Sequence, residues 1–207
     1  MISESIMTEF FVKTAVNLAK HGNIERRYIE LYAKAMEVAL ATGINLTAAL
    51  IIGYFMGMWW HCIIFLTAFI PLRAYAGGYH AQGYVSCFFQ SVVFLVLILS
   101  SIKYLAMKGL MLSSIWQLFI ISAAVVMLFA PLADKNRPIS EKEALFFKKR
   151  TQFVVAAESF TVLILHWFRV NYSYAVIMAV ILNAYALVLH VCVASLQSAQ
   201  EPKEINT

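Results

Sequence analysis

Residues 38–72, VALATGINLTAALIIGYFMGMWWHCIIFLTAFIPL, form an uninterrupted run of 35 residues without a formal charge. A helix of that length would extend about 50 Å, whereas the hydrocarbon core of a bilayer is about 30 Å thick. The run therefore predicts two membrane-spanning helices joined by a tight turn near Gly53–Trp60. Trp59, Trp60 and His61 suit a position at the membrane interface beside that turn.

The composition of the whole chain supports a membrane protein. Of its 207 residues, 62% are hydrophobic and 13% are charged, whereas soluble domains average roughly 45–50% and about 25%. A soluble protein of this length has no interior large enough to hide so much apolar surface. The N-terminus does not resemble a secretory signal, because charged residues interrupt it before any long apolar core. We therefore expect an all-α, polytopic membrane protein.

The alternation of apolar and charged segments predicts about six transmembrane helices, preceded by an N-terminal amphipathic helix in the membrane interface. We expect a single membrane domain over residues 1–207, without an internal repeat. Its predicted segments are amphipathic N-terminal helices (1–37), two spans (38–72), a polar strip (73–85), two spans (86–133), a basic cytoplasmic loop (134–150), two spans (151–196) and a polar tail (197–207).

Basic residues are distributed unequally between the two sides of the membrane that six spans would define. An even number of spans places both termini on one side, together with 13 of the 16 Lys and Arg residues; the other side keeps Lys103, Lys108 and Arg169. Because cytoplasmic loops are enriched in basic residues, we expect the termini, the basic loop and the polar strip in the cytoplasm. The net charge of +5 then reflects topology and attraction to anionic lipid, so we expect no nucleic-acid partner.

The segment Arg73–Cys87, RAYAGGYHAQGYVSC, carries the candidate chemistry. His80 and Cys87 supply an imidazole and a thiol, the groups that nucleophilic acyl transfer needs. In one continuous helix the two residues would be about 10 Å apart along the axis, whereas proton transfer needs roughly 3 Å. The backbone must therefore break between them, or they must come from different subunits of a homodimer. Three glycines supply freedom for a break: Gly77, Gly78 and Gly83.

A histidine and a cysteine at this spacing can also be two satisfied polar residues at the end of a span. Arg73 favours a functional site, because it is the only basic residue between Lys34 and Lys103 and lies in the same strip. Cys62 and Cys192 lie within apolar runs, and we expect both to be small buried hydrophobic residues. No paired cysteine spacing indicates a disulfide framework or a zinc site, so we expect no metal and no cofactor.

The segment Arg73–Cys87 strongly resembles the signature of the accessory gene regulator B (AgrB) family: an Arg, then a small-Gly-x-His-Ala run, then a Cys seven residues after the His. The resemblance extends over most of the chain, including a later Ala-Pro…Lys-x-x-Pro loop, here Ala130–Pro131 through Lys135–Pro138. It implies a quorum-sensing endopeptidase of the bacterial cell membrane. Such an enzyme cuts a small amphipathic, AgrD-like propeptide and helps to close the signal peptide into a thiolactone.

Carried over by position, the resemblance implies that Cys87 is the nucleophile and His80 its base, in a reaction that needs neither metal nor ATP. Arg73 and Gly78 match positions that the family keeps, with less defined roles, and we include the neighbouring Gly77 in the same supporting set.

Two further features leave alternatives open. Glu158 is the only carboxylate within an apolar segment, and ionisable groups inside a membrane are often functional. It could orient His80 as a third catalytic residue, contact a neighbouring helix, or be neutral. The basic run at residues 148–150 could attract an acidic propeptide tail or serve as a topology anchor.

The alternative function is a small polytopic peptide exporter, or a membrane scaffold without catalysis. An exporter would be expected to carry charges that face a central cavity and to consist of two similar halves. Here the two halves do not resemble each other, and Glu158 is the sole acidic residue within a predicted span. The motifs of other intramembrane hydrolases and transferases, such as GxSx, EExxxR and DHHC, are also absent from the sequence.

Overall fold

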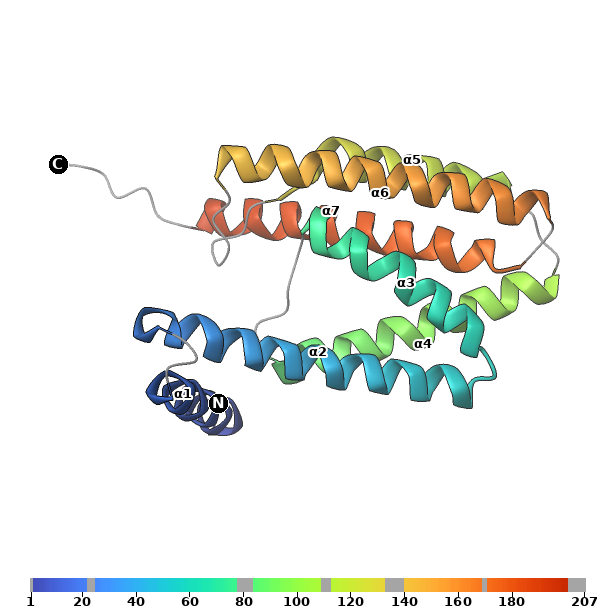
Figure 1. The fold of residues 1–207 in the computed structure, drawn as a ribbon. Coiled ribbons are helices and arrows are strands. Elements are labelled where there is room, and N and C mark those ends of the chain that lie inside the picture. The colour runs from blue at the N-terminus through green and yellow to red at the C-terminus, as the bar shows by residue number, and fades with distance from the viewer. Residues whose placement is uncertain are drawn as a thin grey trace. The chain divides into compact units, whose positions relative to one another are not determined.

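The structure is a computed structural model of the chain. It describes residues 2–21, 25–77, 84–108, 113–132, 140–168 and 171–200. These residues form seven α-helices and one 3-10 turn (Figure 1), so the expected all-α fold is confirmed. The elements are α1 (Ile2–Lys20), η1 (Arg26–Tyr28), α2 (Ile29–Phe55), α3 (Trp59–Ala76), α4 (Tyr84–Lys108), α5 (Ser113–Phe129), α6 (Glu141–Trp167) and α7 (Ser173–Gln200).

Three stretches of helix in the described chain are long and apolar enough to cross a membrane: Arg26–Phe55, Val85–Met107 and Ser173–Val193. They belong to α2 with its preceding turn, to α4 and to α7. A shorter apolar helix, Ser114–Phe129, makes up most of α5. The chain is therefore a membrane protein with several apolar helices. The predicted spans in α3 and α6 are less apolar, because α3 carries polar residues at both ends and α6 begins with charged turns.

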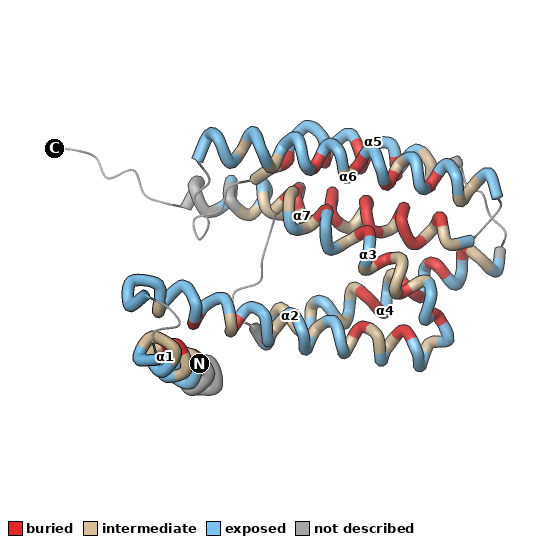
Figure 2. Tube along the Cα trace, viewed as in Figure 1, coloured by how far each residue is buried: buried red, intermediate tan, exposed pale blue. Residues whose placement is uncertain are grey.

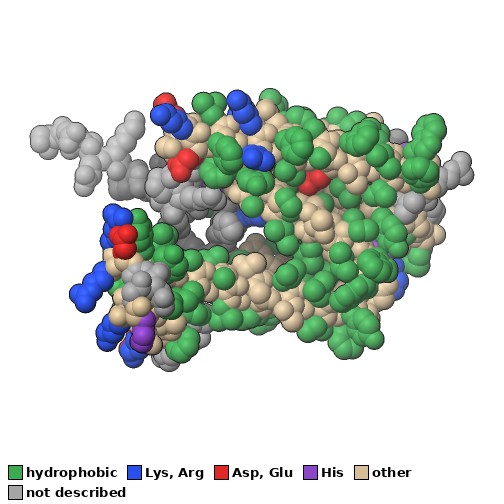
Figure 3. All heavy atoms as spheres, in the orientation of Figure 1, with side chains coloured by type: hydrophobic (Ala, Val, Ile, Leu, Met, Phe, Trp, Pro, Cys, Tyr) green, Lys and Arg blue, Asp and Glu red, His purple; other side chains and the backbone are tan. Residues whose placement is uncertain are grey.

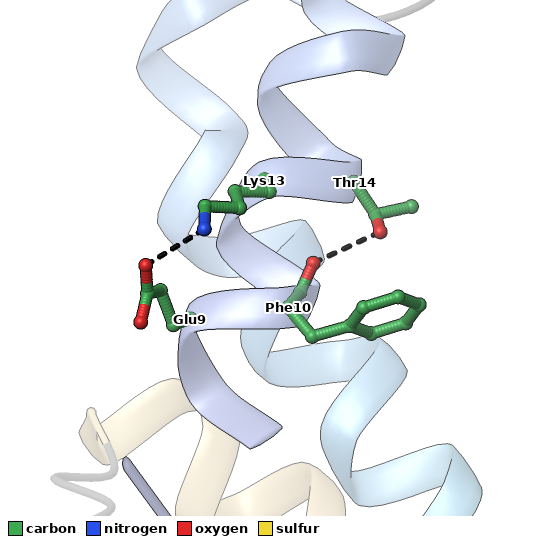
Figure 4. A network of polar contacts seen from close by, with 4 residues as sticks. All are labelled: Glu9, Phe10, Lys13 and Thr14. Carbon is green, nitrogen blue, oxygen red and sulfur yellow. Dashed lines mark hydrogen bonds and ion pairs between the residues drawn. The ribbon is translucent and has the colours of Figure 1, made fainter. Parts of the chain in front are cut away.

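The chain forms two compact units, residues 1–55 with 81–96 and residues 56–80 with 97–207. In the first unit α1 packs along α2, and Ala15 of α1 is fully buried. On the exposed side of α1, Lys13 pairs with Glu9 at 2.8 Å, and Thr14 donates a hydrogen bond to the carbonyl of Phe10 (Figure 4). The bond from Lys13 lowers the pKa of Glu9. Both side chains are largely exposed, so the pair contributes little to stability.

Helix α2 runs without a break from Ile29 to Phe55, so residues 29–37 belong to the same helix as the predicted first span. At about 1.5 Å per residue this helix is about 40 Å long, enough for the hydrocarbon core and part of the headgroup layer. Helix α3 begins at Trp59, so the helices are interrupted where the sequence predicted a turn. Gly57 lies in this turn with φ of +67°, a left-handed conformation that glycine adopts without steric cost.

In the second unit α3, α5 and α6 all pack against α7 (Figure 1), and α6 also contacts α3 and α5. Figure 2 shows that the buried residues of this unit concentrate on α7 and on the faces of its neighbours. The buried side of α7 is made largely of alanine and β-branched residues: Ala175, Val176, Ile177, Ala179, Val180 and Ala184. Small residues let helices approach closely, which is how helices associate in a membrane.

The predicted loop at residues 134–150 is wrong from Glu141 onward, where α6 begins. Ser140 is the N-cap of α6. Its hydroxyl accepts a hydrogen bond from the backbone N–H of Glu143, and the Glu143 carboxylate accepts one from the backbone N–H of Ser140. This reciprocal capping box stabilises the first turn of a helix. The high charge of the segment favoured a loop in the sequence analysis, although its Ser-x-x-Glu pattern is a helix start signal. Residues 133–139 of the predicted loop lie outside the described part of the chain.

Cysteines 62 and 192 differ in their burial. Cys62 is fully buried, as expected, but Cys192 is exposed, so the prediction for Cys192 is wrong. Hydrophobic side chains cover much of the outer surface in Figure 3, and apolar residues on such a surface face lipid rather than protein. An apolar run therefore does not distinguish a side chain in the protein core from one in contact with lipid.

Candidate functional site

The structure places the predicted site residues in three helical contexts. Arg73 lies in the last turn of α3, with Gly77 as the residue that ends this helix. Cys87 lies at the start of α4, and Glu158 lies in the middle of α6. Gly78 and His80 lie outside the described residues, so the structure gives no distance between His80 and Cys87.

The C-terminal end of α3 is closed by its own arginine. Arg73 Nη1 donates a 2.6 Å hydrogen bond to the carbonyl oxygen of Gly77, and the backbone N–H of Gly77 donates to the carbonyl of Arg73 at 3.2 Å. A cation at a helix C-terminus also complements the partial negative charge of the unpaired carbonyls there. Arg73 thus fixes the point at which the chain leaves α3 and begins the polar strip.

Gly77 brings the end of α3 against the segment that follows α5. The backbone N–H of Leu132 donates to the carbonyl of Ala76 at 3.2 Å, and Gly77 and Leu132 form an isolated parallel bridge. Gly77 has φ of +73° and ψ of −148°, a conformation that is almost restricted to glycine. A β-carbon at this position would lie 2.9 Å from the carbonyl oxygen of Leu132, closer than real contacts allow. Both the conformation and the close approach therefore require glycine.

This contact joins two segments that are distant in sequence. Ala130 and Pro131, which begin the Ala-Pro…Lys-x-x-Pro loop, directly precede Leu132. Ala130 is buried. Its backbone N–H donates a 3.1 Å hydrogen bond to the carbonyl of Val126 and so continues the hydrogen bonding of α5. The start of the polar strip is thereby attached to the start of this loop. The sequence shows each motif separately and does not predict their contact, because neither motif carries a local signal of the other.

Cys87 is half-buried, close to the start of α4. The first four N–H groups of a helix have no carbonyl partner within it. Cys87 is the fourth described residue of α4, so it belongs to the first turn of this helix as described. Such donors can stabilise an oxyanion that forms next to a nucleophile.

Glu158 lies on the buried face of α6 and is 8% exposed. Both of its carboxylate oxygens are buried and have no hydrogen-bond partner. The structure does not test a contact with His80, because His80 is outside the described residues. No group of three or more His, Cys, Asp or Glu side chains that could hold a metal ion occurs within the described ranges.

Substitution of Gly77 by alanine should destabilise the protein more than the same substitution at two other glycines. Gly57→Ala introduces only a strained positive φ, with nothing within 4 Å of the new β-carbon, and should cost roughly 1–2 kcal/mol. Gly77→Ala adds the clash with Leu132 and should cost more. Gly43→Ala, in the middle of α2 with open space around it, should cause no loss. Thermal unfolding of the purified variants in detergent measures this order, and equal midpoints for the Gly77 and Gly57 variants would contradict it.

Comparison with known proteins finds a matching family model and similar relatives. A family model described as accessory gene regulator B matches residues 11–190. An accessory gene regulator protein B of Staphylococcus saprophyticus is 28% identical over 132 residues, which cover 62% of this chain and 66% of that protein. Another of the same name from Staphylococcus aureus (strain MW2) is 25% identical over 174 residues, or 84% of this chain and 89% of that protein. No solved structure gives a significant match.

Proposed function

Since the chain belongs to the accessory gene regulator B family, we propose that it is a membrane cysteine endopeptidase that processes an AgrD-like propeptide. The family match carries the proposal, because it covers the whole segment Arg73–Cys87, which contains His80 and Cys87. The cysteine at the start of α4 and the closely fixed end of α3 are compatible with this role.

The proposed reaction begins with proton transfer from the Cys87 thiol to His80. The thiolate attacks the scissile carbonyl carbon of the propeptide, and the resulting oxyanion accepts hydrogen bonds from the backbone donors at the start of α4. The C–N bond then breaks, and the imidazolium of His80 returns the proton to the leaving amine. The N-terminal part of the propeptide remains attached to Cys87 as a thioester.

Ring closure follows by exchange of one thioester for another. The thiol of a cysteine within the bound propeptide attacks the acyl carbon, and Cys87 leaves as a thiol. One C–S bond forms while another breaks, so the step is nearly neutral in free energy and keeps the activation gained at cleavage. Exclusion of water from the site would favour this exchange over hydrolysis.

In this mechanism Arg73 and Gly77 are positioning residues. Arg73 holds the carbonyl of Gly77, and Gly77 permits the contact with Leu132, so both set where the chain toward His80 leaves α3. We also propose six spans, with α3 and α6 as the two that are less apolar, and a cytoplasmic location for the active site.

Replacement of Cys87 or His80 by alanine should abolish propeptide cleavage and leave insertion into the membrane unchanged. The loss should be complete for either variant, because nucleophile and base act as one chemical unit. Cys62→Ala and Cys192→Ala are the matched controls and should cleave normally. Coexpression with an epitope-tagged propeptide, followed by gel electrophoresis, measures cleavage. Normal cleavage by the Cys87→Ala variant would disprove the assignment.

A propeptide whose internal cysteine is replaced by alanine should trap the enzyme. It should still acylate Cys87, since attack on the scissile bond does not involve the internal thiol, but no group then resolves the thioester. A covalent adduct between the enzyme and the N-terminal part of the propeptide should accumulate, and neutral hydroxylamine should release it. If the C-terminal fragment appears with repeated turnover and no adduct, water enters the site freely, and ring closure needs another agent.

Single introduced cysteines should report the proposed topology. In a variant without native cysteines, a cysteine at Asn136 or Thr207 should be protected from a membrane-impermeant thiol reagent in intact cells, whereas one at Lys108 should react. The asymmetry of basic residues predicts this pattern. Reaction of the cysteine at position 136 in intact cells would overturn the six-span topology.

A further inference from the structure

The buried face of α6 contains one carboxyl group among side chains that are apolar or form a hydrogen bond within the helix. Thr151, Val155, Glu158 and Val162 recur at intervals of three or four residues, which places them on the side of the helix that packs in the second unit. The Thr151 hydroxyl donates to the carbonyl of Phe147 in its own helix at 2.9 Å. Glu158 forms no such hydrogen bond within its own helix, since both of its carboxyl oxygens are buried without a partner.

Asn183 of α7 is a second buried side chain whose hydrogen bonding is incomplete. It is 1% exposed, and its Nδ2 donates to the carbonyl of Ala179, one turn earlier, at 2.9 Å. Its Oδ1 is buried and accepts no hydrogen bond. An apolar interior makes such an orphan atom costly, by roughly 1–3 kcal/mol for a neutral polar group.

Counted along their helices, Glu158 and Asn183 are nearly equally far from the connection between α6 and α7. Helices α6 and α7 contact each other, run in opposite directions (Figure 1) and are joined by residues 168–172. Glu158 precedes the last residue of α6 by nine positions, and Asn183 follows the first residue of α7 by ten. At about 1.5 Å per residue, the two side chains are about 14 Å and 15 Å from the connected ends. Their levels therefore differ by much less than one helical turn.

We propose that Glu158 and Asn183 form a hydrogen-bonded clasp between α6 and α7. The neutral carboxylic acid of Glu158 donates its O–H to Oδ1 of Asn183. The carboxyl and the amide oxygen can satisfy each other only if one supplies a proton, and a carboxylic acid has an O–H donor. An ionised carboxylate at this position would be costly, because neither oxygen of Glu158 has a hydrogen-bond partner among the described residues. The clasp thus pairs one carboxyl oxygen of Glu158 with the orphan amide oxygen of Asn183.

The clasp would influence the position of the polar strip, because it would influence the position of α3. Helix α3 packs against both α6 and α7, so the spacing between those two helices determines the surface on which α3 rests. The C-terminal end of α3 carries Arg73 and Gly77, from which the chain continues to His80. This consequence rests on the proposed peptidase function, whereas the clasp itself does not. Glu158 and Asn183 are therefore assigned as positioning residues rather than as groups that touch the substrate.

A double-mutant cycle on the purified full-length protein in detergent tests the clasp. Glu158→Ala and Asn183→Ala should each lower the thermal midpoint by about 2–6 °C, the range that one interhelical hydrogen bond gives in a protein of this size. The double variant should lose no more than the larger single loss. Glu158→Gln should keep the wild-type midpoint, because its amide can donate to the same oxygen. Ser159→Ala, at the neighbouring position, is the control and should be neutral, since that hydroxyl bonds only within α6 at 2.8 Å.

Cleavage kinetics with the propeptide then test whether the clasp also positions the active site or only stabilises the fold. Glu158→Ala should lower kcat at a temperature where the protein is fully folded and leave KM unchanged, and Glu158→Gln should restore kcat. Additive losses in the thermal cycle, or a Glu158→Gln variant as unstable as Glu158→Ala, would overturn the clasp. Non-additive losses in the thermal cycle together with an unchanged kcat would support the clasp and overturn only its role in positioning. If the chain did not cleave propeptide at all, the thermal cycle would still decide whether the clasp exists.

Discussion

Backbone hydrogen bonding is the constraint on which the rest of this structure depends. Within a membrane no water is available to pair with free N–H and C=O groups, so a chain can leave a helix there only where other parts of the protein receive it. The end of α3 meets this requirement through Arg73, which bonds the carbonyl of Gly77, and through Leu132, which bonds the carbonyl of Ala76. These contacts pair the backbone carbonyls of Ala76 and Gly77, where α3 ends.

In the proposed mechanism, the same constraint gives a role to residues that take no part in the chemistry. A thioester is useful for ring closure only if the internal thiol reaches it before water does. The nucleophile and its base therefore need fixed positions at the edge of a low-water region, rather than a mobile loop in solvent. Gly77 supplies such a position at the end of α3, because a β-carbon on this residue would lie only 2.9 Å from the Leu132 carbonyl oxygen.

The sequence predicted the helical class and the family better than it predicted boundaries and long-range contacts. Apolar runs and their lengths are local properties, so the interruption between α2 and α3 was visible at Gly53–Trp60. The start of α6 was missed because the charge of the segment outweighed the Ser140–Glu143 capping box. The exposure of Cys192 was missed because hydrophobicity does not separate lipid-facing from core positions. The contact of Gly77 with Leu132 depends on tertiary packing, for which neither segment has a local pattern.

Polar groups in the second unit also bear on how its helices find the correct partners. Lipid tails are as apolar as leucine, so hydrophobic burial alone gives little preference for one helix pair over another in a membrane. Close approach of small side chains on α7 supplies one source of specificity, because alanines such as Ala175 and Ala179 admit a neighbouring backbone. The clasp between the carboxyl of Glu158 and the amide of Asn183 would supply a second source of specificity, since both groups lack this partner in any register that separates them.

The clasp also bears on the register of the two helices. A slip of α6 along α7 by one turn would displace Glu158 from Asn183 by about 5.4 Å, beyond the reach of a hydrogen bond. The clasp therefore selects a register as well as a partner, and α3, which rests on both helices, takes its own position from that register.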